Sequence, residues 1–300
     1  MSGKHQFTIV GLGELLWDQL PGGHQLGGAP ANFAYWAAAL GDNGVIASCV
    51  GADQLGQNAI DFLRRNRVDT AHLQRIASRP TGTVRIELNE RGQPDFVIAE
   101  DVAWDYLEWT SDWEALARRT DALSFGTLAR RSPRSAETIS RFIQSADSAL
   151  IVFDVNLRES FYSTAIIVEA LSQSHIAKLN RDELPLVMEI VGTQCRSPAD
   201  SARFLLDKYD LELVCVTLGA DGSRLVTDSE VVEHPAIAVD VVDTVGSGDG
   251  FGAALVHHYL RGSSLEVISG AANRLGSLIA GRAGAMPPTA GLGLECCDFH

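Results

Sequence analysis

Short apolar runs alternate with amphipathic stretches along most of this chain. The apolar runs at 7–11, 45–50, 122–125, 149–153, 176–179 and 213–218 read as strands. Several are continuous rather than alternating, which is typical of strands covered on both faces. Between them, 29–40 reads as a buried apolar helix and 57–65 as an amphipathic one. This alternation predicts an α/β domain with a mostly parallel sheet and helices on both of its faces.

One region departs from the strand–helix alternation. Residues 83–88 alternate apolar and polar side chains, 89–92 contain turn residues, and 96–99 are again apolar. The pattern predicts an antiparallel β-hairpin with one solvated face. Such a hairpin has no evident place in a parallel sheet. We interpret it as a lid over a site or as a dimer contact, with a surface hairpin of no special role as the alternative.

The composition of the chain limits the kinds of partner and the cellular location that we expect. The net charge is −14, which argues against binding nucleic acid or an anionic membrane. No segment approaches the roughly 20 apolar residues of a membrane span, and the first residues do not resemble a signal peptide. The five cysteines form no C-x-x-C pair. We therefore expect a cytoplasmic protein with reduced thiols that uses no cysteine-bound metal.

The richest chemical signal is the run of small residues from Asp243 to Gly252. Without bulky side chains, the backbone N–H groups of Gly246, Ser247 and Gly248 can surround an anion, and the helix that follows adds the positive end of its dipole. Asp249 would stand beside a bound phosphate, where it could accept a proton from an attacking hydroxyl. The alternative is an ordinary glycine-rich turn.

Other polar segments lie at predicted strand ends or helix starts. They are Gly27–Asn32, Asp154–Arg158, Asn180–Glu183 and Thr217–Ser223. Asn32 within an apolar helix needs a partner, either a sugar hydroxyl or the local backbone. The N-x-x-E segment could hold magnesium through water or could simply cap a helix. The last segment is either a nucleotide contact or a hairpin turn. Neither a Rossmann fingerprint nor a Walker phosphate loop is present.

Taken together, the segments 27–32, 41–51 and 243–256 resemble the ribokinase-like, PfkB-type carbohydrate kinases, and the similarity extends from about residue 7 to 287. The segments 13–18, 26–30 and 154–158 resemble the fructokinase branch. The resemblance implies a three-layer α/β/α sandwich with a small β lid near 14–25 and 82–100. It implies one kinase domain over 1–290, followed by a tail, 291–300, of unknown role.

The resemblance also implies a role for individual residues. Asp249 would be the catalytic base, with Gly246, Ser247 and Gly248 as the anion hole. Sugar hydroxyls would contact Asp18, Gly28, Asn32 and Arg158. ATP would contact Asn180, Thr217, Gly219, Gly222 and Asn273, the last near the adenine. Glu183 would arrange magnesium, and Asp243 and Val245 would bind a monovalent cation, usually potassium.

The implied reaction is ATP-dependent phosphorylation of a sugar primary hydroxyl, with D-fructose as the expected substrate. The alternatives are a kinase for 2-keto-3-deoxygluconate, ribose or a nucleoside, and a non-catalytic sugar-binding regulatory relative. A homodimer through the lid is a further expectation, because exposed strand edges seek partners.

Overall fold

The computed structural model describes residues 6–20, 22–88, 94–193 and 197–294. Over these residues, an eight-stranded sheet has the order β14-β13-β12-β11-β10-β9-β1-β4. Its parallel part runs from β12 to β4, while β13 and β14 are antiparallel. The strands are β1 (Thr8–Leu12), β4 (Asn43–Ala47), β9 (Ala122–Phe125), β10 (Leu150–Asp154), β11 (Ile176–Asn180), β12 (Leu213–Thr217), β13 (Ser223–Val226) and β14 (Val231–His234). The predicted, mostly parallel sheet is confirmed.

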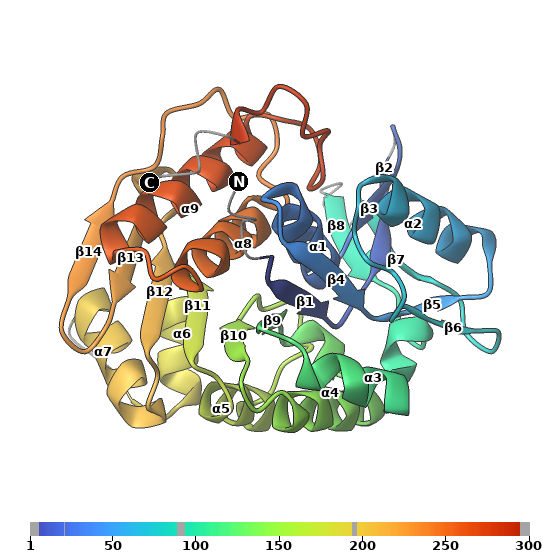
Figure 1. The fold of residues 1–300 in the computed structure, drawn as a ribbon, viewed down its shortest axis with the longest axis horizontal. Coiled ribbons are helices and arrows are strands. Elements are labelled where there is room, and N and C mark those ends of the chain that lie inside the picture. The colour runs from blue at the N-terminus through green and yellow to red at the C-terminus, as the bar shows by residue number, and fades with distance from the viewer. Residues whose placement is uncertain (1–5, 21, 89–93, 194–196, 295–300) are drawn as a thin grey trace.

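Helices cover both faces of this sheet, as the strand–helix alternation predicts. One layer contains α1 (Ala29–Ala39), α8 (Ser247–Tyr259) and α9 (Leu265–Ala280), with α2 (Gln54–Arg65) beside them (Figure 1). The other contains α3 (Ser111–Arg118), α4 (Pro133–Ser145), α5 (Thr164–Ser172), α6 (Glu183–Ile190) and α7 (Pro198–Tyr209). Short 3-10 turns occur at Ala103–Tyr106, Leu128–Arg130 and Gly219–Asp221. Within the described ranges, no helix has both the length and the apolar character needed to cross a membrane.

The continuous apolar strands are explained by a core on each side of the sheet. Along β10, Leu150 and Val152 join the cluster formed with α1, α8 and α9. The alternate residues, Ile151 and Phe153, join the cluster formed with α3 to α7. Because successive side chains of a strand point to opposite faces, a strand buried on both faces must be apolar at every position.

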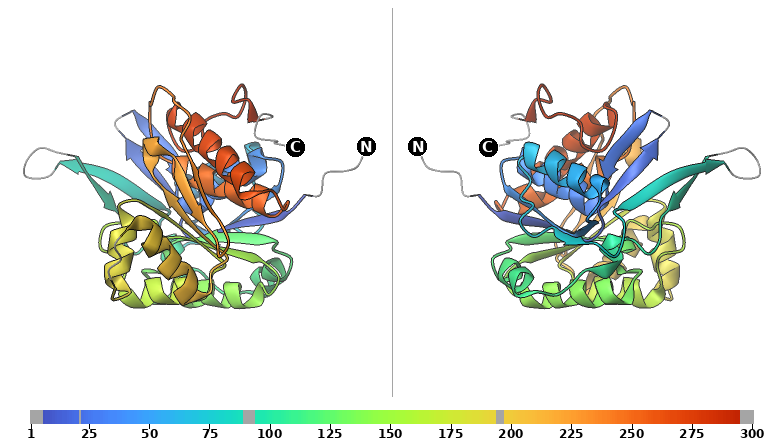
Figure 2. Two further views of the ribbon diagram at one scale, coloured as in Figure 1. Left: turned by 90° about the vertical axis from the view of Figure 1, so that its left-hand side faces the viewer. Right: turned by 90° about the vertical axis from the view of Figure 1, so that its right-hand side faces the viewer.

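A second, four-stranded sheet stands beside the main body and is called the lid sheet below. Its order is β3-β2-β7-β8, with β2 (Leu16–Leu20), β3 (Gly23–Gly27), β7 (Gly82–Leu88) and β8 (Pro94–Ile98). The predicted hairpin is therefore confirmed, although its turn at 89–92 lies within residues that the structure does not describe. β2 pairs in parallel with β7, so the two expected lid segments form one sheet, which projects from the body (Figure 2).

Two local predictions need correction. The run 45–50 is not one strand: β4 ends at Ala47, and β5 (Cys49–Gly51) pairs with β6 (Gln74–Ile76) in a separate sheet. The sequence does not predict the break at Ser48, because the break depends on the pairing of β5 with the distant β6. Asp154, expected just after a strand, is the last residue of β10.

Candidate active site

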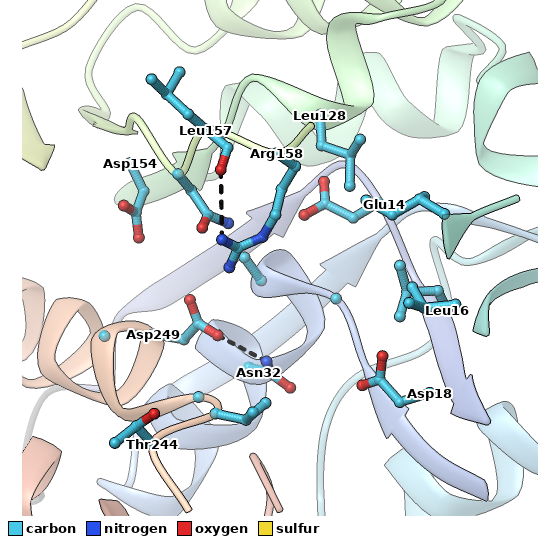
Figure 3. A pocket seen from close by; sticks show the side chains of 18 of the residues that line it. Glu14, Leu16, Asp18, Asn32, Leu128, Asp154, Leu157, Arg158, Thr244 and Asp249 are labelled. Carbon is cyan, nitrogen blue, oxygen red and sulfur yellow. Dashed lines mark hydrogen bonds between the residues drawn. The ribbon is translucent and has the colours of Figure 1, made fainter. Parts of the chain in front are cut away.

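A cavity of about 740 Å³ lies where the carboxyl ends of β10, β11 and β12 meet the lid sheet. Most of the predicted site residues line it, namely Asp18, Gly28, Asn32, Arg158, Asn180, Glu183, Thr217, Asp243, Val245, Gly246, Gly248 and Asp249. They come from segments far apart in the chain, and Figure 3 shows several of their side chains converging on one space. The position agrees with the general rule that open α/β sheets bind ligands at the carboxyl ends of their strands.

The glycine-rich loop ends at the first turn of α8. Gly246 is the N-cap residue and has φ 78°, a left-handed conformation that favours glycine. A Cβ at this position would lie 2.5 Å from the Cβ of Ala285, so a larger residue could not fit without movement. Among the described residues, the N–H groups of Gly246 and Gly248 have no hydrogen-bond acceptor. The loop therefore presents free donors and the positive end of a helix to the cavity.

Ser247 differs from its glycine neighbours. Its N–H donates to the carbonyl of Thr244 at 3.2 Å, and the residue is not part of the cavity wall. Its hydroxyl oxygen is buried without a partner among the described residues. The N–H of Ser247 is thus used to close the turn, whereas those of Gly246 and Gly248 are not used within the described residues; the three-residue anion hole stays a prediction.

Asp249 is held by a contact between distant parts of the sequence. The side-chain nitrogen of Asn32, on α1, donates to Oδ2 of Asp249 at 2.7 Å. Burial raises the pKa of Asp249 to about 6, and the nearby Asp154 adds to the rise. Lys178, Asn32 and Arg158 act in the opposite direction. The carboxylate is thus oriented, and it gains a proton only in mildly acidic solution.

A buried ion pair forms the floor beneath Asp249, and sequence reasoning missed one of its members. Nζ of Lys178, on β11, lies 2.8 Å from Oδ2 of Asp154. Burial lowers the pKa of Lys178, but Asp154 and the more distant Asp249 reverse that effect and leave it raised. A Cβ on Gly248 would lie 3.4 Å from this Nζ, which places the cation against the first turn of α8. The available signal was a single lysine inside the apolar run 176–179.

The N-x-x-E segment has the geometry of a helix cap. Oδ1 of Asn180 accepts the N–H groups of Asp182 and Glu183, each at 2.9 Å. The two carboxylate oxygens of Glu183 accept the N–H groups of Leu157 at 2.9 Å and Asn180 at 2.8 Å. Burial raises the pKa of Glu183. The segment therefore ties the end of β11 to the loop after β10, while both Asn180 and Glu183 still face the cavity.

The metal predictions can be compared with the donor groups present. In the described part of the chain, no group of three or more His, Cys, Asp or Glu side chains is arranged to hold a metal. Magnesium usually keeps several waters and binds through one or two carboxylates and substrate phosphates, which fits Glu183 and Asn180 at a cavity wall. Asp243 accepts the N–H groups of Val245 and Gly284, each at 3.0 Å. It closes the loop in which the cation site is predicted.

Asp18 on β2 lines the side of the cavity formed by the lid sheet, while Arg158, on the loop after β10, extends its guanidinium group toward Asp249 (Figure 3). Burial raises the pKa of Asp18 to about 6, Arg158 lowers it, and Asp243 raises it. Gly28 has φ 101°, and a Cβ there would lie 2.7 Å from the carbonyl oxygen of Glu14. Glycine is required at this position because the chain leaving β3 passes directly over the chain leaving β1.

Three predicted nucleotide contacts lie outside the cavity wall: Gly219, Gly222 and Asn273. The segment containing the two glycines connects β12 to the antiparallel β13, so the hairpin-turn alternative describes its shape. Asn273 is 5% exposed, and its amide nitrogen donates to the hydroxyl of Ser223 at 2.8 Å and the carbonyl of Ser269 at 2.9 Å. Asn273 thus links α9 to β13 and does not line this cavity, and its place near the adenine stays a prediction.

Comparison with known proteins agrees with this architecture. The model of the pfkB family of carbohydrate kinases matches residues 14–290. The crystal structure of the uncharacterized sugar kinase PH1459 from Pyrococcus horikoshii superposes with a TM-score of 0.79 at 28% identity, covering 94% of each chain. Fructokinase-1 from Oryza sativa subsp. japonica is 27% identical over 314 residues, which cover 96% of this chain and 95% of that protein.

A second solved structure shows the shared fold. Fructokinase from Xylella fastidiosa with bound ATP superposes with a TM-score of 0.81 at 21% identity, covering 96% of this chain and 98% of that one. The three-layer fold with its lid sheet, the cavity at the strand ends and the family match over 14–290 lead to one conclusion. The chain belongs to the pfkB family of carbohydrate kinases, and it is an ATP-dependent sugar kinase.

Proposed function

We propose that this sugar kinase transfers the γ-phosphoryl group of ATP to the primary hydroxyl at C6 of D-fructose, with Asp249 as the base. The observation that carries the proposal is the 2.7 Å hydrogen bond from Asn32 to Asp249. It orients a carboxylate at the N-terminus of α8, next to the unused N–H groups of the glycine loop. The choice of fructose is supported by the similarity to Fructokinase-1 from rice.

The chemistry follows from this arrangement. The sugar oxygen attacks the γ-phosphorus while the bond from that phosphorus to the ADP oxygen breaks. In a loose transition state the hydroxyl proton moves late, and it passes to the carboxylate of Asp249. The N–H groups of Gly246 and Gly248 would hold the charged phosphoryl oxygens. Lys178 would remain paired with Asp154 and would offset the negative charge beneath them.

The remaining predicted residues divide between the two substrates. Asp18, Gly28, Asn32 and Arg158 would surround the sugar, because they line the cavity between the lid sheet and Asp249. Asn180 and Thr217, at the ends of β11 and β12, would lie along the nucleotide phosphates. Magnesium held by Glu183 and Asn180 through water would neutralise phosphate charge, and potassium would lie beside Asp243 and Val245.

The lid sheet would close over the sugar and exclude water. Ile98, the last residue of β8, donates its N–H to Oε1 of Glu159 at 3.0 Å. Glu159 adjoins Arg158, so the lid is tied to the loop that would hold the sugar. The edges of the lid sheet are β3 and β8. We retain the homodimer through these edges as part of the proposal, together with a single kinase domain over 1–290 and a cytoplasmic location.

Substrate choice is tested by ADP release from ATP in the presence of magnesium and potassium. The panel is fructose, glucose, ribose, tagatose, 2-keto-3-deoxygluconate and adenosine. We expect strong turnover on fructose and weak turnover on the others. Preferred turnover on another member would reassign the substrate and keep the mechanism. A folded protein that binds ATP but phosphorylates no member would contradict the fructose proposal and favour the regulatory alternative.

A further inference from the structure

Glu14 is a buried acid in the cavity wall to which sequence analysis assigned no role. It follows Gly13 in the connection from β1 to β2 and is only 2% exposed. Its Oε2 atom has no hydrogen-bond partner among the described residues. Buried polar atoms nearly always have a partner, and leaving one without costs free energy. In Figure 3 the carboxyl group points into the cavity, beside Leu128 and toward Arg158.

The backbone around Glu14 is fixed, so its carboxyl group cannot easily turn elsewhere. Gly28 packs so closely on the Glu14 carbonyl oxygen that a Cβ would approach within 2.7 Å. The neighbouring Leu15 and Leu16 are buried in the apolar core. Glu14 lines the cavity, so the carboxyl group that carries the unpartnered oxygen is held at the cavity wall.

The charge state of this group determines what it can bind. Burial is the main cause that raises the pKa of Glu14 to about 7, and the charge of Asp249 adds to the rise. Arg158 and the N–H groups of Glu14 and Ala29 act in the opposite direction. Near neutral pH a large share of the protein thus carries a neutral carboxyl group here. Such a group can donate one hydrogen bond and accept others, which matches a hydroxyl group.

We propose that Glu14 is a sugar-binding residue, whose carboxyl group pairs with one hydroxyl of the acceptor other than the hydroxyl that is phosphorylated. The inference rests on the proposed function, since it takes a sugar as the occupant of this end of the cavity. It adds Glu14 to Asp18 and Asn32 as a residue that selects among hydroxyl patterns. A site that pairs with a specific hydroxyl discriminates strongly against analogues that lack it.

The test uses a series of monodeoxy analogues of the sugar that the wild-type enzyme phosphorylates best. Glu14→Met removes the hydrogen bond and keeps most of the volume, and Glu14→Gln keeps a donor and an acceptor. We expect Glu14→Met to raise the KM of the sugar about 5- to 30-fold, and to leave the KM of ATP within about twofold. Glu14→Gln should stay within about threefold of wild type.

The analogue series separates binding from general damage. If Glu14 pairs with one hydroxyl, Glu14→Met and wild type should have the same KM for the single analogue that lacks that hydroxyl. For the other analogues, Glu14→Met should keep its full increase in KM. Leu16→Ala, in the same wall but without a polar group, serves as the control and should penalise every analogue alike. An unchanged KM in Glu14→Met, or an equal penalty on all analogues, overturns the assignment.

Failure of the proposed function is recognised separately. If fructose is not a substrate but another sugar is, the deoxy series is built on that sugar and the same outcomes apply. If wild-type enzyme turns over no sugar, the proposed function fails. Calorimetric binding of the same sugars to wild type and Glu14→Met then decides the role of Glu14: equal affinities overturn it, and a selective loss supports it.

Discussion

Replacement of Asp249 by Asn tests the central feature of the proposed mechanism. Asparagine has the same shape, and its side-chain oxygen can still accept the hydrogen bond that Asn32 donates at 2.7 Å. The glycine loop and the Lys178–Asp154 pair are untouched. The substitution therefore removes the proposed proton acceptor while it leaves the fold, the proposed anion-binding donors and the proposed sugar pocket in place.

The size of the effect follows from what is lost. A positioned general base contributes about 10²- to 10⁴-fold to a rate, which corresponds to about 3–5 kcal/mol of activation free energy. Because positioning and phosphate binding remain, we expect turnover of Asp249→Asn to fall within this range and not to the uncatalysed rate. The KM of ATP should change little.

The pH profile gives a second readout of the same residue. The pKa of Asp249 in the protein without bound substrates is raised to about 6, so kcat/KM for ATP, measured at saturating sugar, should fall about tenfold per pH unit below 6, as the base becomes protonated. Asp18 titrates in the same range, and saturating sugar keeps its effect on binding out of the measurement. In Asp249→Asn the acidic fall should disappear, because no carboxylate remains to be protonated.

The assay is ADP release at saturating sugar, with ATP binding by calorimetry and thermal unfolding as tests of integrity. Asp200→Asn is a matched control. Asp200 is the third residue of α7, just as Asp249 is the third residue of α8, but it is exposed and distant from the cavity. Near-normal turnover of a folded Asp249→Asn, or an acidic fall identical to the wild type, would refute the assignment of Asp249 as the base.

Three further predictions concern the parts that surround Asp249. Replacing residues 84–98 with a short glycine linker should raise the KM of the sugar and the hydrolysis of ATP without sugar, since water would enter; unchanged values in a folded variant would remove the lid role. Lys178→Met should cost about 3–5 kcal/mol in urea denaturation, because it leaves Asp154 buried and unpaired. The double variant Lys178→Met/Asp154→Leu should recover part of this loss. A double variant no more stable than Lys178→Met would show that pairing of the two side chains does not matter. Glu14 has a folded pKa raised from 4.5 to about 7, so its contribution to stability is complete below about pH 4.5 and is lost as the pH rises to 7. Glu14→Gln should reduce the fall in unfolding free energy across this window by about 3 kcal/mol, and an unaltered pH dependence would show that Glu14 titrates normally.

Several features of this protein were determined by short stretches of sequence. The strands that are buried on both faces were predictable because they are apolar at every position, as 149–153 shows. The hairpin of β7 and β8 was predictable from alternation. The start of α8 was predictable because small residues, an acid and an apolar helix follow one another directly. In each case the pattern of side chains lies within one short segment, so it is visible in the sequence even where the packing partners are distant.

Only the tertiary structure decided which of these segments meet. Asn32 and Asp249 are 217 positions apart, and nothing local indicates their contact. In the sequence, Lys178 is an unexplained charged residue in an apolar strand, and only the structure shows that it pairs with Asp154. Asn273 has a side chain that could contact a ligand, yet its amide nitrogen donates to the hydroxyl of Ser223, where α9 packs on β13. Likewise, Oε2 of Glu14 is buried without a partner only because distant segments pack around it. The burial of a side chain, its hydrogen-bond and ion-pair partners, and its pKa all depend on distances through space. These distances are fixed only when the layers pack together.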